Sequence, residues 1–446
     1  MNHNQLKVLL IIEQCNPGWA SVPLVGYKFF QQISSGANVT LVTHERNKKN
    51  LSQIHPPDQI VYISESNSLK KYYRLIRKLT FKGRMNWPMY HTLMYPFYAE
   101  FNQKTYQQFK DKILNQEYDI VHAMTPMIPR YPVKLIEVCQ HTPFILGPVN
   151  GGIPFPSGFK NKAKQESAEL NFLKTIGRKL LPGYIETYRK ADKVLMGSTY
   201  TFENIKNLFD LRDEQVQLFY ENGIDQEFLS SFTKSQSLNS QKINLLFVGR
   251  LVPYKCADIL IEAVNQLKPS IKQQVQLTIV GDGSEKASLE KQVQDLNLNQ
   301  IITFTGWIEQ KQTLNYYREA DLFCFPSIRE FGGAVVLEAM ACGLPCVVVD
   351  YGGIGEYVTA ETGFKIEPLS RNYLRQELTE KIELLVENSP LRQQMSKKAK
   401  ERVQEFTWEN KAQKIIELYH SIRSKDQVLF PKAVTFKSVV QPISHI

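Results

Sequence analysis

Short apolar runs alternate along this chain with longer segments in which apolar residues recur every three or four positions. Continuous short apolar runs indicate buried strands, and the longer segments indicate helices that each bury one face. A strand followed by a helix, repeated many times, is typical of parallel sheets covered by helices. The pattern therefore predicts an α/β fold.

The apolar runs form two series, which predicts two Rossmann-like domains of similar build. The first series predicts six or seven strands, at Leu6–Ile12, Asn38–Thr43, Gln59–Ile63, Asp119–Ala123, Thr142–Gly147, Lys193–Met196 and Val216–Tyr220. The second series predicts strands at Ile243–Val248, Val275–Val280, Ile301–Phe304, Leu322–Phe325 and Cys346–Val349.

A polar, serine-rich stretch after Asp225 separates the two series and indicates a linker. We place the first domain at residues 1–225, the linker at 226–241 and the second domain at 242–407. Near the end of the chain, Thr407 predicts the N-cap of a helix that runs to Ile422.

Charge and cysteine content narrow the expected partners and compartment. The chain has 54 Lys and Arg against 44 Asp and Glu, a formal charge of +10, which favours anionic partners such as phosphates, acidic lipids or nucleic acid. The six cysteines form no CxxC pair or Cys/His cluster, so we expect a reduced, cytoplasmic protein without a metal site. The longest uncharged stretch, Thr142 to Phe159, is broken by prolines and glycines and cannot be a membrane helix.

The first candidate site lies at the end of the predicted strand Ile243–Val248. Gly249 and Arg250 follow this strand, and Lys255 begins the next helical segment. Ligands of open α/β sheets bind at strand ends, so both cations can converge on one phosphate-sized anion beside a helix N-terminus. Two solvated surface cations remain the alternative interpretation of this spacing.

The second candidate site follows the predicted strand Leu322–Phe325. Two glycines there lead into a short helix whose first amides are unpaired donors. Glu330 precedes this helix and Glu338 lies within it. Because carboxylates beside an anion site repel the anion, hydroxyls of a sugar or ribose are their natural partners. A capping role for Glu330 and an ion pair for Glu338 remain open.

Together these residues resemble the Glu-x7-Glu signature of retaining GT-B glycosyltransferases, the glycosyltransferase family 4 (group 1). The resemblance extends over residues 220 to 420, where further segments are similar to the family's strand ends and loops: Asn222–Asp225, Gly249–Leu251 with Lys255, Val280–Gly283, Phe304–Gly306 and Gly352–Glu356. It implies the GT-B fold, in which two Rossmann-like domains face each other across a cleft. It also implies that a C-terminal segment, about residues 408–446, packs back on the first domain.

The resemblance further implies a role for individual residues. Arg250 and Lys255, next to Gly249, would clamp the diphosphate of a nucleotide sugar, Glu338 would bind the ribose, and Glu330 would contact the transferred sugar. Donor oxygens would also be held by the amides of Gly333, Ala334 and Val335. In the first domain, Gly18 would face the donor phosphates and His122 the donor sugar, although a histidine at a strand end can equally be structural.

Two positions depart from the family pattern. The usual Gly-Phe-Gly between the glutamates is here Phe331-Gly332-Gly333, and the glycine that usually follows the lysine is Cys256. Both departures leave the charged groups in place. We expect Cys256 to serve packing.

The expected activity is that of a retaining, hexosyltransferase-like enzyme of surface polysaccharide or glycolipid biosynthesis. It would move a sugar from a nucleotide-diphosphate sugar to a saccharide or lipid-linked saccharide. No Asp-x-Asp motif occurs in the chain, so we expect no metal and no cofactor. A catalytically silent nucleotide-sugar-binding subunit is one alternative. A Rossmann oxidoreductase is another, but Lys286 stands where the dinucleotide fingerprint needs its third glycine.

A basic segment suggests where such an enzyme would work. Seven cations and no acid lie between Lys70 and Arg84, interleaved with apolar residues at helical spacing. A helix of this kind can lie on anionic lipid, which predicts peripheral attachment to the cytoplasmic face of the membrane. A solvated helix of the first domain is the alternative. No nucleic-acid module accompanies the segment, so we expect no nucleic-acid partner.

Overall fold

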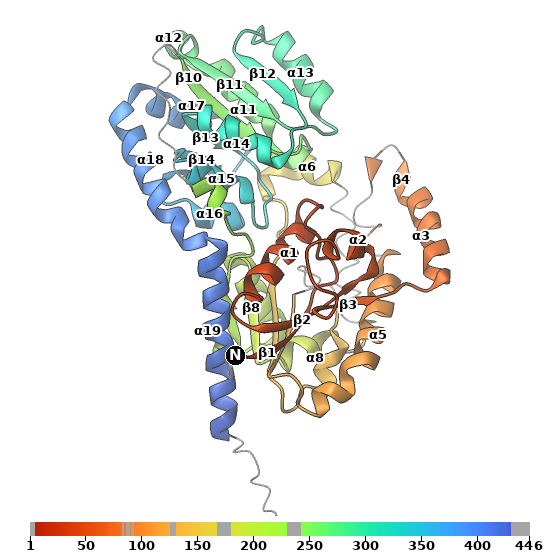
Figure 1. The fold of residues 1–446 in the computed structure, drawn as a ribbon. Coiled ribbons are helices and arrows are strands. Elements are labelled where there is room, and N and C mark those ends of the chain that lie inside the picture. Colours follow the sequence, from red (N-terminus) through yellow and green to blue (C-terminus); the bar gives the residue numbers. More distant parts are fainter. Residues whose placement is uncertain are drawn as a thin grey trace, which may run out of the picture.

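The computed structural model describes residues 5–82, 84–85, 90, 93–124, 131–166, 180–229 and 242–429. It contains two parallel sheets with helices packed around each, and a short ribbon of β4 (Phe81–Lys82) and β5 (Arg84–Met85). Figure 1 shows the two sheets in separate halves of the molecule, which we call the first and the second domain. The predicted α/β class is confirmed.

The first domain contains a sheet of seven strands in the order β3-β2-β1-β6-β7-β8-β9. Its strands are β1 (Lys7–Ile11), β2 (Asn38–His44), β3 (Ile60–Ile63), β6 (Ile120–Ala123), β7 (Phe144–Val149), β8 (Lys193–Met196) and β9 (Val216–Leu218). All seven predicted strands are present, with ends that differ by at most two residues. The helices described in this domain are α1 (Val22–Ile33), α2 (Lys48–Leu51), α3 (Asn67–Thr80), α5 (Tyr95–Leu114), α6 (Lys160–Gln165), α8 (Tyr184–Arg189) and α9 (Thr199–Phe209).

The second domain contains a sheet of six strands in the order β12-β11-β10-β13-β14-β15. Its strands are β10 (Ile243–Val248), β11 (Val275–Val280), β12 (Ile302–Gly306), β13 (Leu322–Phe325), β14 (Cys346–Val349) and β15 (Gly363–Ile366), of which the last was not predicted. Its helices are α11 (Ala257–Gln266), α12 (Pro269–Lys272), α13 (Lys286–Asp295), α14 (Gln310–Glu319), α15 (Ala334–Ala341), α16 (Gly353–Tyr357), α17 (Arg371–Glu387) and α18 (Ser389–Val403).

Both strand orders reverse direction beside the first strand, between β1 and β6 and between β10 and β13. Ligands of open parallel sheets bind outside the carboxyl ends of the strands at such a reversal. The two candidate motifs of the second domain follow β10 and β13, so both fall on its reversal point.

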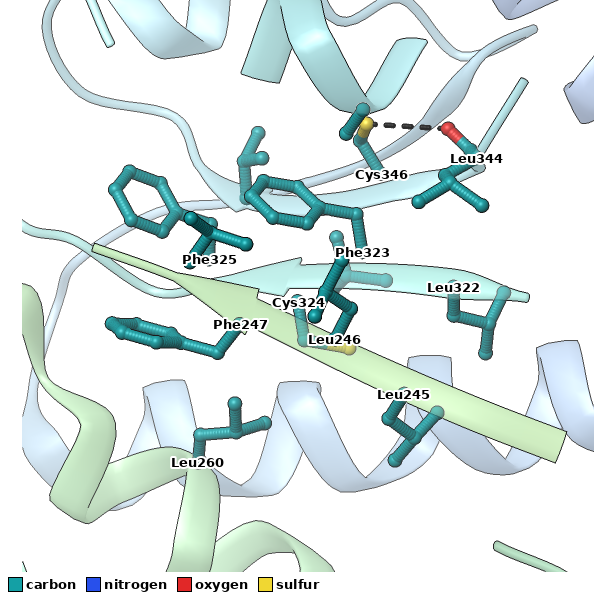
Figure 2. Close-up of a cluster of buried hydrophobic side chains, with 14 of the residues drawn as sticks. Leu245, Leu246, Phe247, Leu260, Leu322, Phe323, Cys324, Phe325, Leu344 and Cys346 are labelled. Carbon is teal, nitrogen blue, oxygen red and sulfur yellow. Dashed lines mark hydrogen bonds between the residues drawn. The ribbon is translucent and has the colours of Figure 1, made fainter. Parts of the chain in front are cut away.

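Side chains from β10 and β13 lie at the centre of the core beneath this reversal point, together with residues such as Leu260 of α11 and Cys346 of β14 (Figure 2). The ring of Phe325 lies 5.5 Å from that of Phe247 and 5.7 Å from that of Phe323, measured between centroids. All three side chains are fully buried, as expected for strands covered on both faces. This packing holds the ends of β10 and β13 side by side.

The C-terminal helix returns to the first domain, as the GT-B resemblance implied. Helix α19 (Trp408–Leu429) runs along the first domain in Figure 1 and packs against α1. Thr407 accepts a hydrogen bond from the Asn410 amide (3.2 Å), which confirms the predicted N-cap. The helix ends at Leu429, beyond the predicted Ile422.

The predicted linker is only partly described. Residues Gln226–Leu229 form the short helix α10, whereas residues 230–241 lie outside the described part of the chain. Residues 430–446 of the predicted C-terminal segment lie outside it as well. No helix among the described residues has the length and apolarity to cross a bilayer.

Candidate functional site

Arg250 and Lys255 lie on the same side of the second domain, at the end of β10. The exposed Arg250 guanidinium donates from Nη2 to the hydroxyl of Tyr254 at 2.8 Å. The Tyr254 carbonyl accepts from the Ile328 amide at 3.0 Å, which ties this turn to the loop after β13. The structure therefore brings the two predicted motifs together.

Lys255 forms an ion pair with Glu330 of the second motif. The same carboxylate oxygen, Oε1, accepts a hydrogen bond from the Ser327 hydroxyl at 2.7 Å. The Lys255 ammonium also lies 4.6 Å from the centroid of the Phe325 ring. Burial lowers the pKa of Lys255, and the nearby carboxylate opposes this effect. Because an ammonium has three N–H groups, this one can bind Glu330 and still donate to a ligand oxygen.

Glu338 is buried within α15, with only 5% of its surface exposed. Its two carboxylate oxygens accept from the Tyr317 hydroxyl (2.8 Å) and the Gln310 amide (2.9 Å). Burial raises the pKa of Glu338, while both hydrogen bonds lower it. These partners are neutral donors, so the alternative of an ion pair is wrong. Each carboxylate oxygen keeps a second lone-pair direction for another donor.

The glycine segment between the glutamates turns sharply into α15. Gly333 has a φ of 63°, in the left-handed region, and a Cβ there would lie 2.2 Å from Cγ2 of Ile354. Both facts require glycine at this position. The amides of Ala334 and Val335 lie in the first turn of α15, where helix amides have no partner within the helix.

Cys256, which directly follows Lys255, has a backbone conformation that favours glycine. Its φ of 54° is also left-handed, a conformation that costs energy for residues with a side chain. The thiol is fully buried, and burial raises its pKa well above the usual range. The side chain packs in the core, as expected.

Gly18 lies in the turn that follows β1. Its amide donates to the Asn16 side chain at 2.9 Å, and a Cβ at this position would lie 2.5 Å from Nδ2 of Asn50. Gly249 lies above the core of the second domain, where a Cβ would approach the Phe325 ring to 3.3 Å. Both glycines thus sit at strand ends where side chains have little room.

His122 does not occupy the position expected of a group that contacts the donor sugar. The imidazole has no exposed surface, and both of its nitrogens are hydrogen bonded within the protein. Nε2 donates to the Gly147 carbonyl at 2.6 Å, so Nδ1 is unprotonated and accepts from the Tyr419 hydroxyl at 2.6 Å. Burial lowers the pKa of His122 to about 4. We correct its role to a structural one, which ties α19 to the first sheet.

Sequence reasoning missed the contacts by which the first domain reaches the loop after β13. The Arg329 guanidinium donates to the Ile153 carbonyl at 3.0 Å and lies 5.0 Å from the centroid of the Phe155 ring. The Asn150 side chain donates to the Phe331 carbonyl at 2.7 Å. Asn150 follows a predicted strand in a glycine-rich turn, which was the only signal for it in the sequence.

Sequence reasoning also missed a buried lysine, Lys411, which lies beside the segment that leads from the first domain into the linker. Lys411 of α19 donates to the Tyr220 carbonyl and lies 4.3 Å from the centroid of the Phe219 ring. Burial lowers the pKa of Lys411 to about 7. Burial also raises the pKa of Glu221 to about 7, which a hydrogen bond from Asn150 and the charge of Lys411 oppose.

A pocket of about 750 Å³ lies elsewhere, between α6 and the second domain. Its lining includes Asp258, which forms ion pairs with both Lys162 and Arg371, and none of the predicted site residues. Among the described residues, no three His, Cys, Asp or Glu side chains gather in a way that could hold a metal ion. The candidate site is therefore the polar surface at the ends of β10 and β13.

The basic segment forms a helix only as far as Thr80, the end of α3, at the outer edge of the first domain (Figure 1), whereas Lys82 and Arg84 lie in the short strands β4 and β5. Its aromatic residues face inward: Tyr72 and Tyr73 pack on Phe97 of α5. Lys71, Arg74 and Leu75 are exposed. The side chains of residues 77–82 and 84–85 lie outside the described part of the structure.

Known glycosyltransferases are similar to this chain in sequence. Residues 230–402 match the family model described as glycosyl transferases group 1. An uncharacterized glycosyltransferase of Methanocaldococcus jannaschii is 30% identical over 234 residues, which cover 52% of this chain and 60% of the relative. The GDP-mannose-dependent monoacylated alpha-(1-6)-phosphatidylinositol monomannoside mannosyltransferase of Corynebacterium glutamicum is 29% identical over 267 residues, which cover 55% of this chain and 68% of the relative. The chain thus spans about 60% of the length of the first curated relatives it matches.

Solved structures resemble the whole chain. HepE of Anabaena, crystallised with UDP, has a TM-score of 0.59 at 19% identity, covering 93% of this chain and 100% of HepE. The lipopolysaccharide outer core galactosyltransferase WaaB has a TM-score of 0.63 at 15% identity, covering 93% of this chain and 99% of WaaB. At these identities the likeness concerns the fold, and this fold is GT-B.

Proposed function

We propose that the chain, whose residues 230–402 match the model of the glycosyl transferases group 1 family, transfers a sugar from a nucleotide-diphosphate sugar to a saccharide or lipid-linked saccharide. One observation carries this proposal. Two cations, Arg250 and Lys255, and the carboxylate of Glu330 lie around the ends of β10 and β13, and a second carboxylate, that of Glu338, lies in α15. Cations suit a diphosphate and carboxylates suit hydroxyls, so this set matches the two chemical halves of a nucleotide sugar.

The cations supply the catalysis in this proposal. Breaking the glycosidic bond to a diphosphate places negative charge on the leaving oxygen, and Arg250 and Lys255 stabilise that charge. At an effective dielectric of about 20, each contact near 4 Å contributes roughly 4 kcal/mol before desolvation. The amides at the start of α15 add donors beside them. We propose that this neutralisation works without a metal ion.

The transfer retains the anomeric configuration in this proposal, as the family resemblance implies. Glu330 positions the hydroxyls of the transferred sugar and is not the nucleophile, because Ser327 and Lys255 already hold its carboxylate. A phosphate oxygen of the departing diphosphate accepts the proton of the acceptor hydroxyl. The new bond forms on the face from which the leaving group departs.

The acceptor in this proposal is lipid-linked, and the enzyme works at the cytoplasmic face of the membrane. The exposed Lys71 and Arg74 of α3 offer positive charge to acidic lipid, and the exposed Leu75 can enter the interface. The relative from Corynebacterium glutamicum, by its printed name, acts on a phosphatidylinositol mannoside. A product of this kind belongs to surface polysaccharide or glycolipid synthesis.

A donor screen tests the proposal. The protein is incubated with UDP-glucose, UDP-galactose, UDP-N-acetylglucosamine or GDP-mannose, with bacterial lipid extract as acceptor, in the presence of EDTA. Release of nucleoside diphosphate and a glycosylated product from one donor is expected. Absence of turnover with every donor contradicts the transferase proposal, whereas turnover that EDTA abolishes and Mn²⁺ restores contradicts its metal independence.

A further inference from the structure

Asn150 of the first domain contacts the loop between the two glutamates of the second domain. It follows β7 and has only 1% of its surface exposed. Its Nδ2 donates to the Phe331 carbonyl at 2.7 Å. Phe331 directly follows Glu330 and precedes the glycines that lead into α15, so Asn150 holds the backbone of the segment that the proposed function assigns to the donor.

The orientation of the Asn150 amide is fixed by its partners. Oδ1 accepts from the Gly151 amide (2.9 Å) and from the hydroxyls of Ser198 (3.0 Å) and Thr201 (2.9 Å). A backbone N–H can only donate and a carbonyl can only accept, so the oxygen and nitrogen of Asn150 cannot exchange places. A fully satisfied buried network of this kind holds a side chain in one conformation.

The start of α9, which holds Asn150, is also bound by the second domain. The Thr199 amide and hydroxyl donate to the two carboxylate oxygens of Glu356, at 2.8 and 2.9 Å. Glu356 lies in α16, and the first residue of α16, Gly353, donates its amide to the Glu330 carbonyl at 3.2 Å. The start of α9 is therefore connected to the loop after β13 by two separate routes.

Residues of the first domain also pack closely against this loop at Gly332. A Cβ at Gly332 would lie 2.0 Å from Nδ2 of Asn222 and 2.4 Å from Oε1 of Glu221. These residues precede the linker, so the loop backbone lies directly against the first domain. A backbone enclosed in this way cannot keep its position if the domains move apart.

We propose that Asn150 is a positioning residue for the donor loop, residues Glu330–Gly333. Its hydrogen bond to Phe331 sets the direction of the amides at the start of α15 and makes the donor geometry depend on the arrangement of the two domains. The proposal rests on the proposed function and deepens it. Asn150 acts through the loop and does not itself touch the donor.

The test compares Asn150→Asp with a matched control. The aspartate has the same shape, but it places a carboxylate oxygen against the Phe331 carbonyl, where two acceptors cannot bond, and beside the buried Glu221 carboxylate. The control, Tyr351→Phe, removes another hydrogen bond between the domains, from the Tyr351 hydroxyl to the Pro154 carbonyl (3.2 Å). This contact does not involve the donor loop.

Three measurements are made on each protein. In Asn150→Asp, kcat with the best donor of the screen is expected to fall roughly tenfold or more. The Kd for UDP or GDP should rise less than kcat falls, because Arg250 and Glu338 stay in place and only the amides at the start of α15 change direction. Hydrogen exchange of the peptide that covers residues 330–336 should accelerate. Tyr351→Phe should match the wild type in all three.

The outcomes separate the two proposals. Unchanged kcat and unchanged exchange in Asn150→Asp overturn the positioning role, as does an equal effect of Tyr351→Phe. If Asn150→Asp does not fold, Ser198→Ala replaces it, since that variant removes one of three donors to Oδ1 together with the N-cap of α9 and should show the same changes at smaller size. If the wild type turns over no donor, the proposed function fails, and hydrogen exchange still decides whether Asn150 holds the loop.

Discussion

The ammonium of Lys255 and the carboxylate of Glu330 form an ion pair, although 75 residues separate them in the chain. Both side chains are largely buried, with 10% and 12% of their surfaces exposed. The carboxylate therefore neutralises the cation that the proposed function assigns to the diphosphate.

This pair predicts opposite effects of Glu330→Gln on binding and on transfer. Glutamine keeps an acceptor for Ser327 but removes a negative charge beside the diphosphate. Nucleoside diphosphates should therefore bind several-fold more tightly, because one screened charge repulsion no longer reduces the binding free energy. Transfer should nevertheless fall roughly a hundredfold, because the sugar hydroxyls lose a charged partner. Titration calorimetry and turnover with the same donor check this. Weaker nucleotide binding at normal turnover would contradict it.

Glu338 should discriminate ribose from deoxyribose. Its carboxylate is held by Tyr317 and Gln310 and, in the proposed function, accepts from the ribose hydroxyls. Wild-type protein should therefore bind the ribonucleoside diphosphate roughly tenfold more tightly than its 2′-deoxy form. Glu338→Gln should bind both forms alike, at the weaker affinity. Tyr317→Phe serves as the control, since it perturbs the same pocket but keeps the carboxylate and should keep the discrimination.

Lys411 should make stability depend on pH above neutrality. Its pKa is about 7 in the folded protein against 10.5 for an unperturbed lysine, so between these values the unfolded chain binds one more proton. Stability from this group therefore rises as pH increases through that window. The melting temperature of the wild type should rise relative to Lys411→Met between about pH 8 and pH 10. If the melting temperatures of the two proteins changed in parallel with pH, Lys411 would keep its ordinary pKa and the prediction would be wrong.

Much of this fold could be predicted because apolar strands and strand-end motifs are local signals. Strand β15 (Gly-Phe-Lys-Ile) escaped prediction because it has only two apolar residues, separated by a lysine, in place of the continuous apolar run of its neighbour β14. The position of Lys411 was predictable in part, since the helical period from Trp408 to Ile415 places it on the buried face. No periodicity, however, indicates that a cation there is held by aromatic rings.

The candidate site likewise contains residues that short sequence segments indicate and contacts that only the folded structure reveals. Arg250, Lys255, Glu330 and Glu338 were predicted from short segments, because each follows a strand or lies at or in a helix. The role of His122 was misjudged because its partner, Tyr419, lies 297 residues away, and no local pattern reports such a contact. The link from Asn150 to Phe331 was missed for the same reason, since it crosses 181 residues and two domains.

Helix α3 should mediate binding to acidic membranes. In Lys71→Glu with Arg74→Glu, two exposed cations become anions, so binding to vesicles that contain phosphatidylglycerol should fall roughly tenfold or more, at about 1 kcal/mol per basic residue near the surface. Lys291→Glu with Lys397→Glu makes the same change of net charge on the second domain and should bind like the wild type. Cosedimentation measures both. Equal loss in the two variants would point to net charge alone, and equal binding to neutral vesicles would argue for a soluble acceptor.

The central claim is that Arg250 and Lys255 hold the departing diphosphate, and the affinity of Arg250→Ala for nucleotides tests it most directly. Calorimetry in EDTA compares the nucleoside diphosphate of the accepted donor with the nucleoside alone, and the exposed Lys291→Ala is the control. We predict that Arg250→Ala weakens binding of the diphosphate roughly tenfold or more and leaves binding of the nucleoside unchanged. Equal affinity of Arg250→Ala and wild type for the diphosphate would contradict the account.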